Sequence, residues 1–165
     1  MLSDVMDESE LSFRPIFVDS GIYILEKVKK IKGEVDYNVY LPGRIEVASM
    51  EIAYKNPPVK EVFEDMKGNT LVFNSQCILK DIKSERKGLG TVLMKELFKD
   101  CIEQKVYTIS LISAQDEKER AEKGTIDPIY FYREIRTRLY EYIEAMYEEK
   151  PYNDARTVVY KLKSK

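Results

Sequence analysis

The sequence predicts a mixed α/β domain with a mostly antiparallel sheet and one parallel pair of strands. Residues 44–54 and 106–112 alternate apolar and polar side chains, as strands buried on one face do. Residues 76–82 read as a further strand, and residues 90–104 carry apolar side chains at helical spacing. The order strand, helix, strand predicts that 76–82 and 106–112 are parallel and joined by a right-handed crossover.

The other elements of the first half of the chain are predicted from the periodicity of apolar residues and from turn-forming residues. Residues 13–18 form a first strand, and residues 22–32 fit neither period cleanly and are interpreted as a helix. Pro57-Pro58 is expected to break the chain, and 59–67 to form one helical turn or a loop. Residues 70–73 join 76–82 as one strand or as two.

The second half is expected to end on a long helix and a strand. Residues 116–125 are charged without a period, which indicates a surface loop. Asp127-Pro128 is a favourable helix start, and the helix is predicted to run to about residue 148. Its inward side chains would be Ile135, Leu139, Ile143 and Met146. Pro151 follows the predicted helix, and residues 157–162 form the last strand.

The length and the net charge of the chain limit the classes of protein to which it can belong. A chain of 165 residues and 19.3 kDa holds one core, so we expect a tail over residues 1–12 and a single domain over 13–165. A net charge of −2 and a pI near 5.5 argue against nucleic acid as the main partner. The acidic N-terminus lacks an apolar signal core and no stretch reaches membrane-spanning length, so we expect a cytoplasmic protein that binds no membrane.

The chain contains no histidine, which narrows the chemistry available to it. Histidine general bases, Ser-His and Cys-His dyads and most zinc sites are excluded, and no metal cofactor is expected. Cys77 and Cys101 lie in an apolar segment and on an apolar helix face, so both are expected to be buried thiols.

The turn between residues 82 and 90 is the strongest candidate binding site. Gly88-Leu89-Gly90 separates a strand from a helix, which brings several backbone N–H groups and a helix N-terminus to one place suited to phosphate oxygens. Arg86 and Lys87 precede this turn, and Thr91 adds a hydroxyl. A Gly-x-Gly pattern alone is more often a turn that opens a helix, and a neighbouring Arg-Lys pair is usually solvated.

Three blocks of the sequence together resemble the GNAT acetyltransferases. Glu85-Arg86-Lys87-Gly88-Leu89-Gly90-Thr91, followed by Val92-Leu93-Met94, resembles the coenzyme A loop of that family. Asp127-Pro128-Ile129-Tyr130-Phe131-Tyr132 resembles the family's stretch ending in Phe-Tyr at a helix start, and Val158-Val159-Tyr160-Lys161-Leu162 resembles its terminal strand. The resemblance covers residues 70–162.

The resemblance implies a fold, a cofactor and a way of binding it. The parallel strands would splay at the cofactor site and helices would cover both faces of the sheet. Acetyl-CoA would be the co-substrate, with its pantetheine arm paired along the backbone of Ile82, Lys83 and Ser84. Its pyrophosphate would lie on the N–H groups of Lys87, Gly88, Leu89, Gly90 and Thr91, beside Arg86.

The implied reaction is transfer of an acetyl group to the amine of an acceptor whose class stays open. A backbone N–H near Ile82 would polarise the tetrahedral intermediate. Tyr132 is the candidate general acid, because a phenol is protonated at neutral pH and can donate to a leaving thiolate. The amine must lose a proton, for which Glu46, Glu51 and Asp81 are candidates; Glu51 and Asp81 rank first.

Two departures from the family keep other readings open. Glu85 stands where the family has Gln or Arg, so Arg86 would replace that contact. A family Gly-Phe pair is missing after Tyr132, which puts the following strand in doubt. The alternatives are a GNAT-like domain that binds coenzyme A or a protein without catalysis, and a plain interaction module. The tyrosines at 130, 132, 140, 142 and 147 would line an acceptor pocket or the interface of a homodimer.

Overall fold

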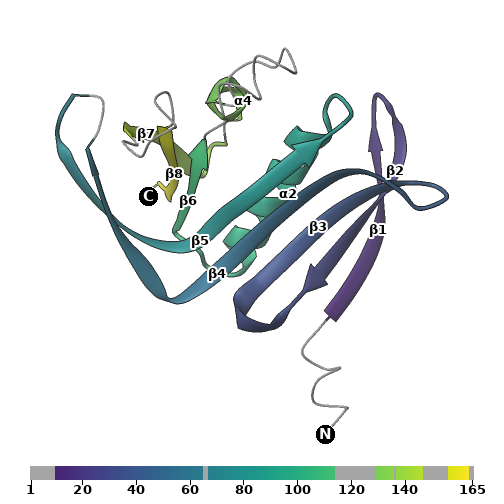
Figure 1. Cartoon of the computed structure of the whole chain (residues 1–165), viewed down its shortest axis with the longest axis horizontal. Coiled ribbons are helices and arrows are strands. Elements are labelled where there is room, and N and C mark those ends of the chain that lie inside the picture. The colour runs from purple at the N-terminus through teal and green to yellow at the C-terminus, as the bar shows by residue number, and fades with distance from the viewer. Residues whose placement is uncertain (1–9, 65–66, 114–128, 136, 147–155, 164–165) are drawn as a thin grey trace, which may run out of the picture. The chain divides into compact units, whose positions relative to one another are not determined.

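The computed structural model describes residues 10–64, 67–113, 129–135, 137–146 and 156–163. These residues form two compact units (Figure 1). The first unit contains the chain up to Lys55 together with Ile78–Gln104, and the second contains Asn56–Cys77 and the chain from Lys105 onward. Two strands run through both units. The prediction of a single domain stays a prediction, and the strand that begins at Glu10 includes the last residues of the expected tail.

The fold is a mixed α/β fold, as predicted. An eight-stranded sheet has the order β1-β2-β3-β4-β5-β6-β8-β7, and it is antiparallel apart from one parallel pair, β5 and β6. The elements, in chain order, are β1 (Glu10–Val18), β2 (Gly21–Lys29), the 3-10 turn η1 (Ile31–Gly33), β3 (Glu34–Leu41), β4 (Ile45–Glu64), β5 (Thr70–Ser84), α2 (Leu89–Glu103), β6 (Thr108–Ser113), α4 (Ile129–Glu134), β7 (Tyr140–Met146) and β8 (Arg156–Leu162).

The helix predicted over residues 22–32 is wrong, because β2 occupies most of that segment. Tyr23 and Leu25 are buried while the intervening Ile24 is exposed, which is the alternation of a strand. The helix prediction failed because apolar residues also stand at the exposed positions and hide the period of two. The tight β1–β2 hairpin pairs Val18 with Gly21, so the first strand is confirmed and the second is its partner.

The strand predicted over 44–54 is confirmed, but it continues further than expected. β4 runs through Pro57-Pro58 to Glu64, so the predicted chain break and the helical turn or loop at 59–67 are both wrong. The two segments 70–73 and 76–82 form the single strand β5. The prolines are tolerated here because β3 pairs with β4 only as far as Ala53, so β4 has an edge that β3 does not cover at Pro57 and Pro58.

The turn η1 connects β2 to β3 and requires a glycine. Gly33 has φ +77°, and a Cβ atom there would lie 2.5 Å from the carbonyl oxygen of Tyr54. Because a real Cβ never approaches a carbonyl so closely, only glycine fits. This close approach presses the turn against β4.

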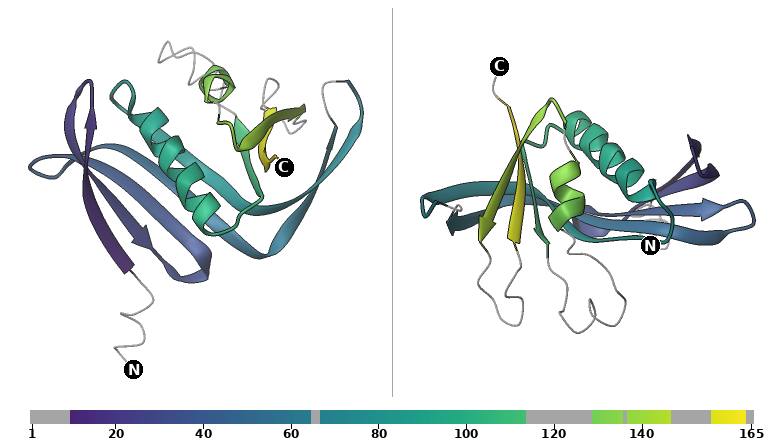
Figure 2. Two further views of the ribbon diagram at one scale, coloured as in Figure 1. Left: turned by 180° about the vertical axis from the view of Figure 1, so that it is seen from behind. Right: turned by 90° about the horizontal axis from the view of Figure 1, so that it is seen from above.

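Helix α2 packs along one face of the strands of the first unit (Figure 2). Its predicted apolar face is confirmed, because Leu93, Met94, Leu97 and Cys101 are fully buried. On the sheet the facing side chains are those of β2, β3 and β4: Tyr23, Leu25, Val35, Tyr37, Val39, Met50 and Ile52. Cys77 and Cys101 are buried thiols, as predicted.

The long helix predicted from Asp127 to about residue 148 is wrong. Asp127 and Pro128 lie outside the described residues; α4 ends at Glu134, and the chain then forms the strand β7. β7 and β6 each pair with β8, which confirms the last strand. Ile135 is buried as predicted, whereas Leu139 is 52% exposed. The strand that the missing Gly-Phe pair had put in doubt is therefore present.

A set of charged side chains is buried between α2 and the first strands. Glu96, which is 4% exposed, receives hydrogen bonds or ion pairs from Arg14 of β1 and Lys27 of β2. Lys27 Nζ also lies 3.0 Å from Asp100 Oδ1, and the Tyr37 hydroxyl donates to Asp100 Oδ2 at 2.6 Å. Burial raises the pKa of Glu96, but the two cations outweigh burial and hold that pKa below its usual value. These contacts tie three strands to one helix.

Replacing Lys27 by Met is expected to lower the free energy of unfolding by about 3 kcal/mol, because it leaves two partly buried carboxylates with fewer partners. Urea denaturation at pH 7 measures the change. Lys29→Met is the matched control, since Lys29 is half exposed and its Nζ lies 3.9 Å from Glu10 Oε2. Its effect should stay within about 0.5 kcal/mol. Equal effects of the two substitutions would contradict a stabilising role of the buried charges.

Candidate cofactor-binding loop

The loop from Ser84 to Thr91 joins β5 to α2 and is fixed by its own backbone. The Ser84 hydroxyl donates to the carbonyl oxygen of Arg86 at 2.6 Å, and the Leu89 N–H donates to the same oxygen at 3.4 Å. The Glu85 N–H donates to the carbonyl oxygen of Val47 on β4 at 2.9 Å. Leu89 is fully buried, so both ends of the loop are anchored.

The helix that follows this loop begins without a side-chain cap. Gly88 is the N-cap residue with φ +88°, and no acidic residue occupies the first turn of α2. In the described part of the chain, the N–H groups of Lys87, Gly88, Gly90 and Thr91 have no acceptor. The first N–H groups of a helix carry the positive end of its dipole. The loop therefore presents uncompensated donors at one place, as an anion site requires.

The cations of the loop differ in their surroundings. Lys87 is exposed and forms no ion pair with any described residue, whereas the Arg86 guanidinium is near enough to the Tyr23 hydroxyl to lower the pKa of Tyr23. Tyr23 Oη also lies 2.9 Å from Ser20 Oγ. The hydrogen bond from Ser20 chiefly lowers the pKa of Tyr23; burial opposes this, and Arg86 lowers the pKa further. The Arg86 side chain thus lies toward the β1–β2 hairpin, and both cations are exposed.

The backbone N–H and C=O groups of successive residues in β5 point to opposite edges of the strand, so the three residues predicted to pair with a cofactor do not all point the same way. Because the Glu85 N–H points to β4, the backbone groups of Lys83 point to β4 as well. Those of Ile82 and Ser84 then point to the opposite edge of β5. Of the three predicted residues, only Ile82 and Ser84 direct their N–H and C=O groups away from β4.

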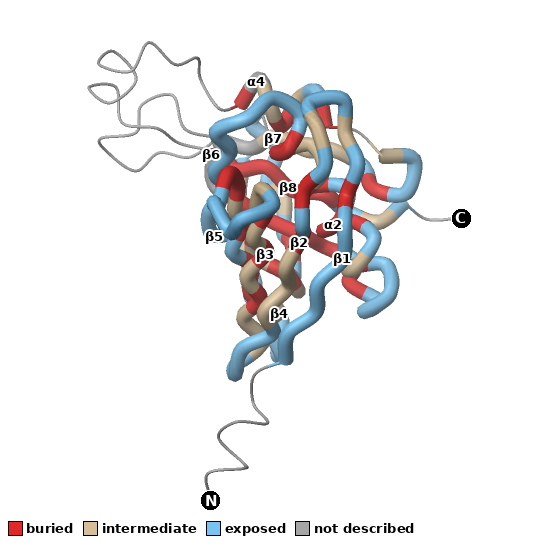
Figure 3. Tube along the Cα trace, turned by 90° about the vertical axis from the view of Figure 1, so that its right-hand side faces the viewer, coloured by how far each residue is buried: buried red, intermediate tan, exposed pale blue. Residues whose placement is uncertain are grey.

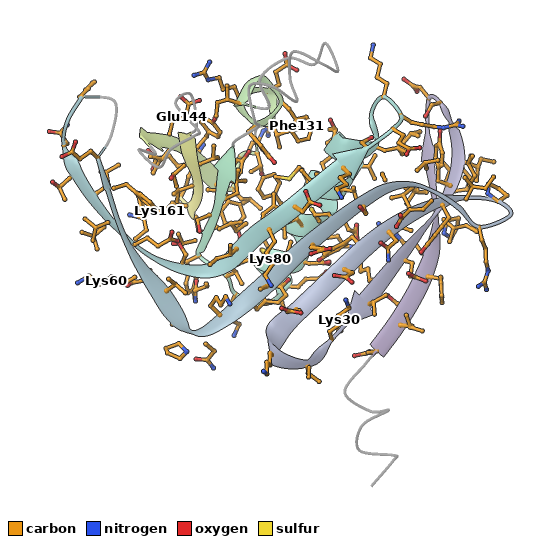
Figure 4. All side chains as sticks on the ribbon, in the orientation of Figure 1. Lys30, Lys60, Lys80, Phe131, Glu144 and Lys161 are labelled. Atoms are coloured by element: carbon orange, nitrogen blue, oxygen red, sulfur yellow. The ribbon has the colours of Figure 1, made fainter. Side chains whose placement is uncertain are left out.

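The two carboxylates ranked first as general bases lie on opposite faces of the sheet. Glu51 shares a face with Glu34, because Glu34 pairs with Ala53 two residues further along β4. Lys80 Nζ lies 2.8 Å from Glu34 Oε1 and is on that face too (Figure 4). Asp81 follows Lys80 and points the other way, where it pairs with Lys83 at 3.5 Å. One reaction centre can use at most one of the two.

The third base candidate, Glu46, lies on the same face as Glu51. It pairs with Tyr40 in the β3–β4 register, and its charge contributes to the raised pKa of Tyr40, for which burial is the first cause. Glu46 is exposed and lies only one residue before Val47, whose carbonyl oxygen anchors the loop.

Tyr132 lies on α4 in the second unit and is 6% exposed. Its ring meets the ring of Phe131 edge-on at 5.2 Å, and its carbonyl oxygen accepts the Tyr160 hydroxyl at 3.3 Å. The role of Tyr132 as an acid stays a prediction. Tyr140 and Tyr142 lie on β7 instead of a helix; the Tyr140 hydroxyl donates to the carbonyl oxygen of Val106 at 2.7 Å and that of Tyr142 to Glu144 at 2.8 Å. Their hydroxyls are engaged within the second unit.

Three groups near the loop were not predicted from the sequence: the carbonyl oxygen of Val47, which accepts the Glu85 N–H, Tyr23 near Arg86, and Ser20 beside Tyr23. All three belong to strands or turns far from the loop in the sequence, and no local sequence motif predicts them. Only the pairing of β1 with β2 and of β4 with β5 brings them to the loop. A Ser-x-x-Tyr pattern at a hairpin is too common to single out a ligand contact.

Within the ranges that the structure describes, no three His, Cys, Asp or Glu side chains are grouped so that they could hold a metal ion. The described helices include none that is long and apolar enough to cross a bilayer.

The chain was compared with protein families, curated proteins and solved structures. No family model matches it, and no curated protein matches it. Among solved structures, a crystal structure of nourseothricin acetyltransferase is similar: the alignment covers 94% of this chain and 86% of that chain, at 13% sequence identity and a TM-score of 0.45. That structural neighbour is an acetyltransferase.

Proposed function

We propose that this chain is an N-acetyltransferase that binds acetyl-CoA at the loop between Ser84 and Thr91. The observation that carries the proposal is the set of unbonded N–H groups at the uncapped start of α2, together with Arg86 and Lys87. A pyrophosphate offers several anionic oxygens to such donors at once. Acetyl-CoA is also the cofactor that the GNAT resemblance of residues 85–91 implies.

The direction of the β5 backbone supports the same ligand. The N–H and C=O groups of Ile82 and Ser84 point away from β4, and a pantetheine arm contains two amides that would pair with them as an added strand does. Glu85 is already bonded to Val47 and contributes no donor. Pantetheine amides at Ile82 and Ser84 would lead directly to a pyrophosphate at Gly88.

The proposed reaction is a direct attack on the thioester. The neutral amine nitrogen of the acceptor forms a bond to the acetyl carbonyl carbon, and the carbon–sulfur bond then breaks. The thiolate of coenzyme A takes a proton from the Tyr132 phenol, and the proton lost by the amine passes to a carboxylate or to water. A chain without histidine can perform this reaction because the donors are a phenol and backbone N–H groups.

A second function is coenzyme A binding without catalysis. The observation that favours it is Glu85, which places an exposed carboxylate inside the loop where the GNAT pattern has Gln or Arg. Release of thiol from acetyl-CoA with a panel of amines separates the two functions. Binding of coenzyme A without turnover on any amine would favour this second function.

Lys87→Ala and Arg86→Ala are each expected to weaken coenzyme A binding about 10- to 100-fold, the range expected for a charge-assisted hydrogen bond to phosphate. Isothermal titration with coenzyme A at low salt measures the affinity. Lys95→Ala is the matched control, because Lys95 is an exposed lysine further along α2. Failure of the unaltered protein to bind coenzyme A would refute the proposed function.

Tyr132→Phe is expected to lower kcat about 10- to 100-fold and to leave coenzyme A affinity unchanged, because only the proton donor is removed. Thiol release measured over a pH series checks this. Tyr107→Phe is the control, since Tyr107 is 53% exposed in the same unit. Equal kcat values for the Tyr132→Phe variant and the unaltered enzyme would remove Tyr132 from the mechanism.

Asp81→Asn and Glu51→Gln are expected to have unequal effects, because the two carboxylates lie on opposite faces of the sheet. One substitution should lower kcat about 100-fold at neutral pH, and the other should change it less than about twofold. The measurement is kcat with the best amine acceptor over a pH series that spans neutrality. Losses of similar size from both would contradict a single base on one face.

A further inference from the structure

The outer face of the β1–β2 hairpin carries a continuous apolar strip that no described element covers. Leu11, Phe13 and Phe17 of β1 are 58–72% exposed, and Ile22 and Ile24 of β2 are 57% and 36% exposed. These five residues are called the apolar strip below. β1 is exposed over most of its length (Figure 3). Scattered apolar residues on a surface are ordinary, but five neighbouring large ones mark a contact surface.

The register of the hairpin places the five side chains on one face. Phe17 pairs with Ile22, Pro15 with Ile24 and Leu11 with Val28. Cross-strand partners project to the same side of a sheet. The other face of the hairpin holds Ile16, Tyr23 and Leu25, which are buried. The strip is therefore the face away from α2, and its exposure is not a by-product of a poorly packed hairpin.

The strip has the size that a weak dimer needs. If a fully exposed large apolar side chain offers roughly 180 Å², the five residues expose about 500 Å². Two copies packed strip to strip would bury about 1,000 Å², the lower limit of specific interfaces. Because both partners supply the same patch, the contact is self-complementary and closes at two copies.

A second copy would stack on the face and would not extend the sheet. β1 is the edge strand of the sheet, and Pro15 stands in its middle without an N–H group. A proline at this place disfavours addition of a further strand to the edge. Two sheets stacked face to face lie about 10 Å apart, so their apolar side chains interdigitate.

Charge selects the orientation of the two copies. The strands next to the strip carry carboxylates on the same face: Glu26 on β2, Glu34 and Asp36 on β3, and Glu46 and Glu51 on β4. Lys30 forms an ion pair with Asp36 and Lys80 with Glu34, whereas Glu26, Glu46 and Glu51 form no ion pair with any described residue. A two-fold axis across the strands would place these carboxylates opposite one another, whereas an axis parallel to the strands sends them to opposite sides.

We propose that this protein forms a homodimer through the apolar strip, with the two β1–β2 hairpins stacked face to face about a two-fold axis parallel to their strands. Phe17 of one copy then lies near Phe17 of the other, and Leu11 lies near Leu11. The acidic surfaces of β3 and β4 face solvent on opposite sides of the dimer. This dimer is independent of coenzyme A binding.

Sedimentation equilibrium of the full chain from about 5 to 500 µM tests the dimer. The unaltered protein is expected to dimerise in this range, and Phe17→Glu or Phe13→Glu should weaken dimerisation at least about 100-fold. Val62→Glu is the control, because Val62 is 58% exposed and lies outside the strip. A protein that stays monomeric at the highest concentration, or a Phe17→Glu variant that dimerises as the unaltered protein does, would overturn the proposal.

Single cysteines test the orientation, since Cys77 and Cys101 are both buried. A bismaleimide that spans about 10 Å, the distance between stacked sheets, should cross-link Phe17→Cys to itself and Leu11→Cys to itself. The two positions lie about 20 Å apart along β1. Cross-linking between the two variants in a mixture, without self-links, would show an axis across the strands and would overturn the proposed arrangement.

Discussion

The attachment of α2 to the first three strands is the constraint on which the candidate loop depends. Apolar contacts of Leu93 and Leu97 bury the helix, but such contacts alone allow a helix to slide along a sheet. Lys27 between Glu96 and Asp100 removes that freedom, because a charged contact at partly buried carboxylates has one good geometry. The position of the first turn of α2 is thereby set by charges two to three turns further along the helix.

This arrangement explains how a loop rich in glycine can present donors in a defined pattern. Gly88 permits the turn, and the burial of Leu89 together with the bond from Glu85 to Val47 holds its two ends. A ligand that binds between them meets N–H groups that are already ordered, so little entropy is lost on binding. Arg86 and Lys87 are both exposed, so their side chains must lose conformational freedom to contribute.

The sequence predicts well those elements in which the spacing of apolar residues matches the residues that are actually buried. Helix α2 has one apolar face, and β8 has a β-branched run, so both were predicted within one or two residues. Residues 22–32 and 135–146 were misread for a common reason: both are strands with apolar side chains on two faces. In β2 the exposed Ile22 and Ile24 obscure the alternation. Around the start of β7 the spacing of Ile135, Leu139 and Ile143 imitates a helix, although only Ile143 belongs to the strand and Leu139 is exposed.

The residues of the candidate site are also of two kinds: some are adjacent in the sequence, and others are placed only by the pairing of distant strands. The loop residues 86–91 form one contiguous motif, so the sequence predicts them as a group, and their role in binding stays a prediction. The choice among carboxylates is not predicted by the sequence, because it depends on which face of the sheet each one occupies. Lys80 and Asp81 are adjacent in sequence and lie on opposite faces. Strand alternation predicts this much, but only the contact of Lys80 with Glu34 shows that Lys80, and not Asp81, shares a face with Glu51.

The exposed isoleucines that misled the assignment of β2 are themselves informative. A strand that packs on one face has no structural need for apolar residues on the other, and charged residues there would protect the edge of the sheet from association. β3 and β4 follow that rule, with Asp36, Glu46 and Glu51 on their outer face. The β1–β2 hairpin departs from it at five positions on one face. A departure at five neighbouring positions on one face of one hairpin is the pattern expected where a surface is covered by another molecule.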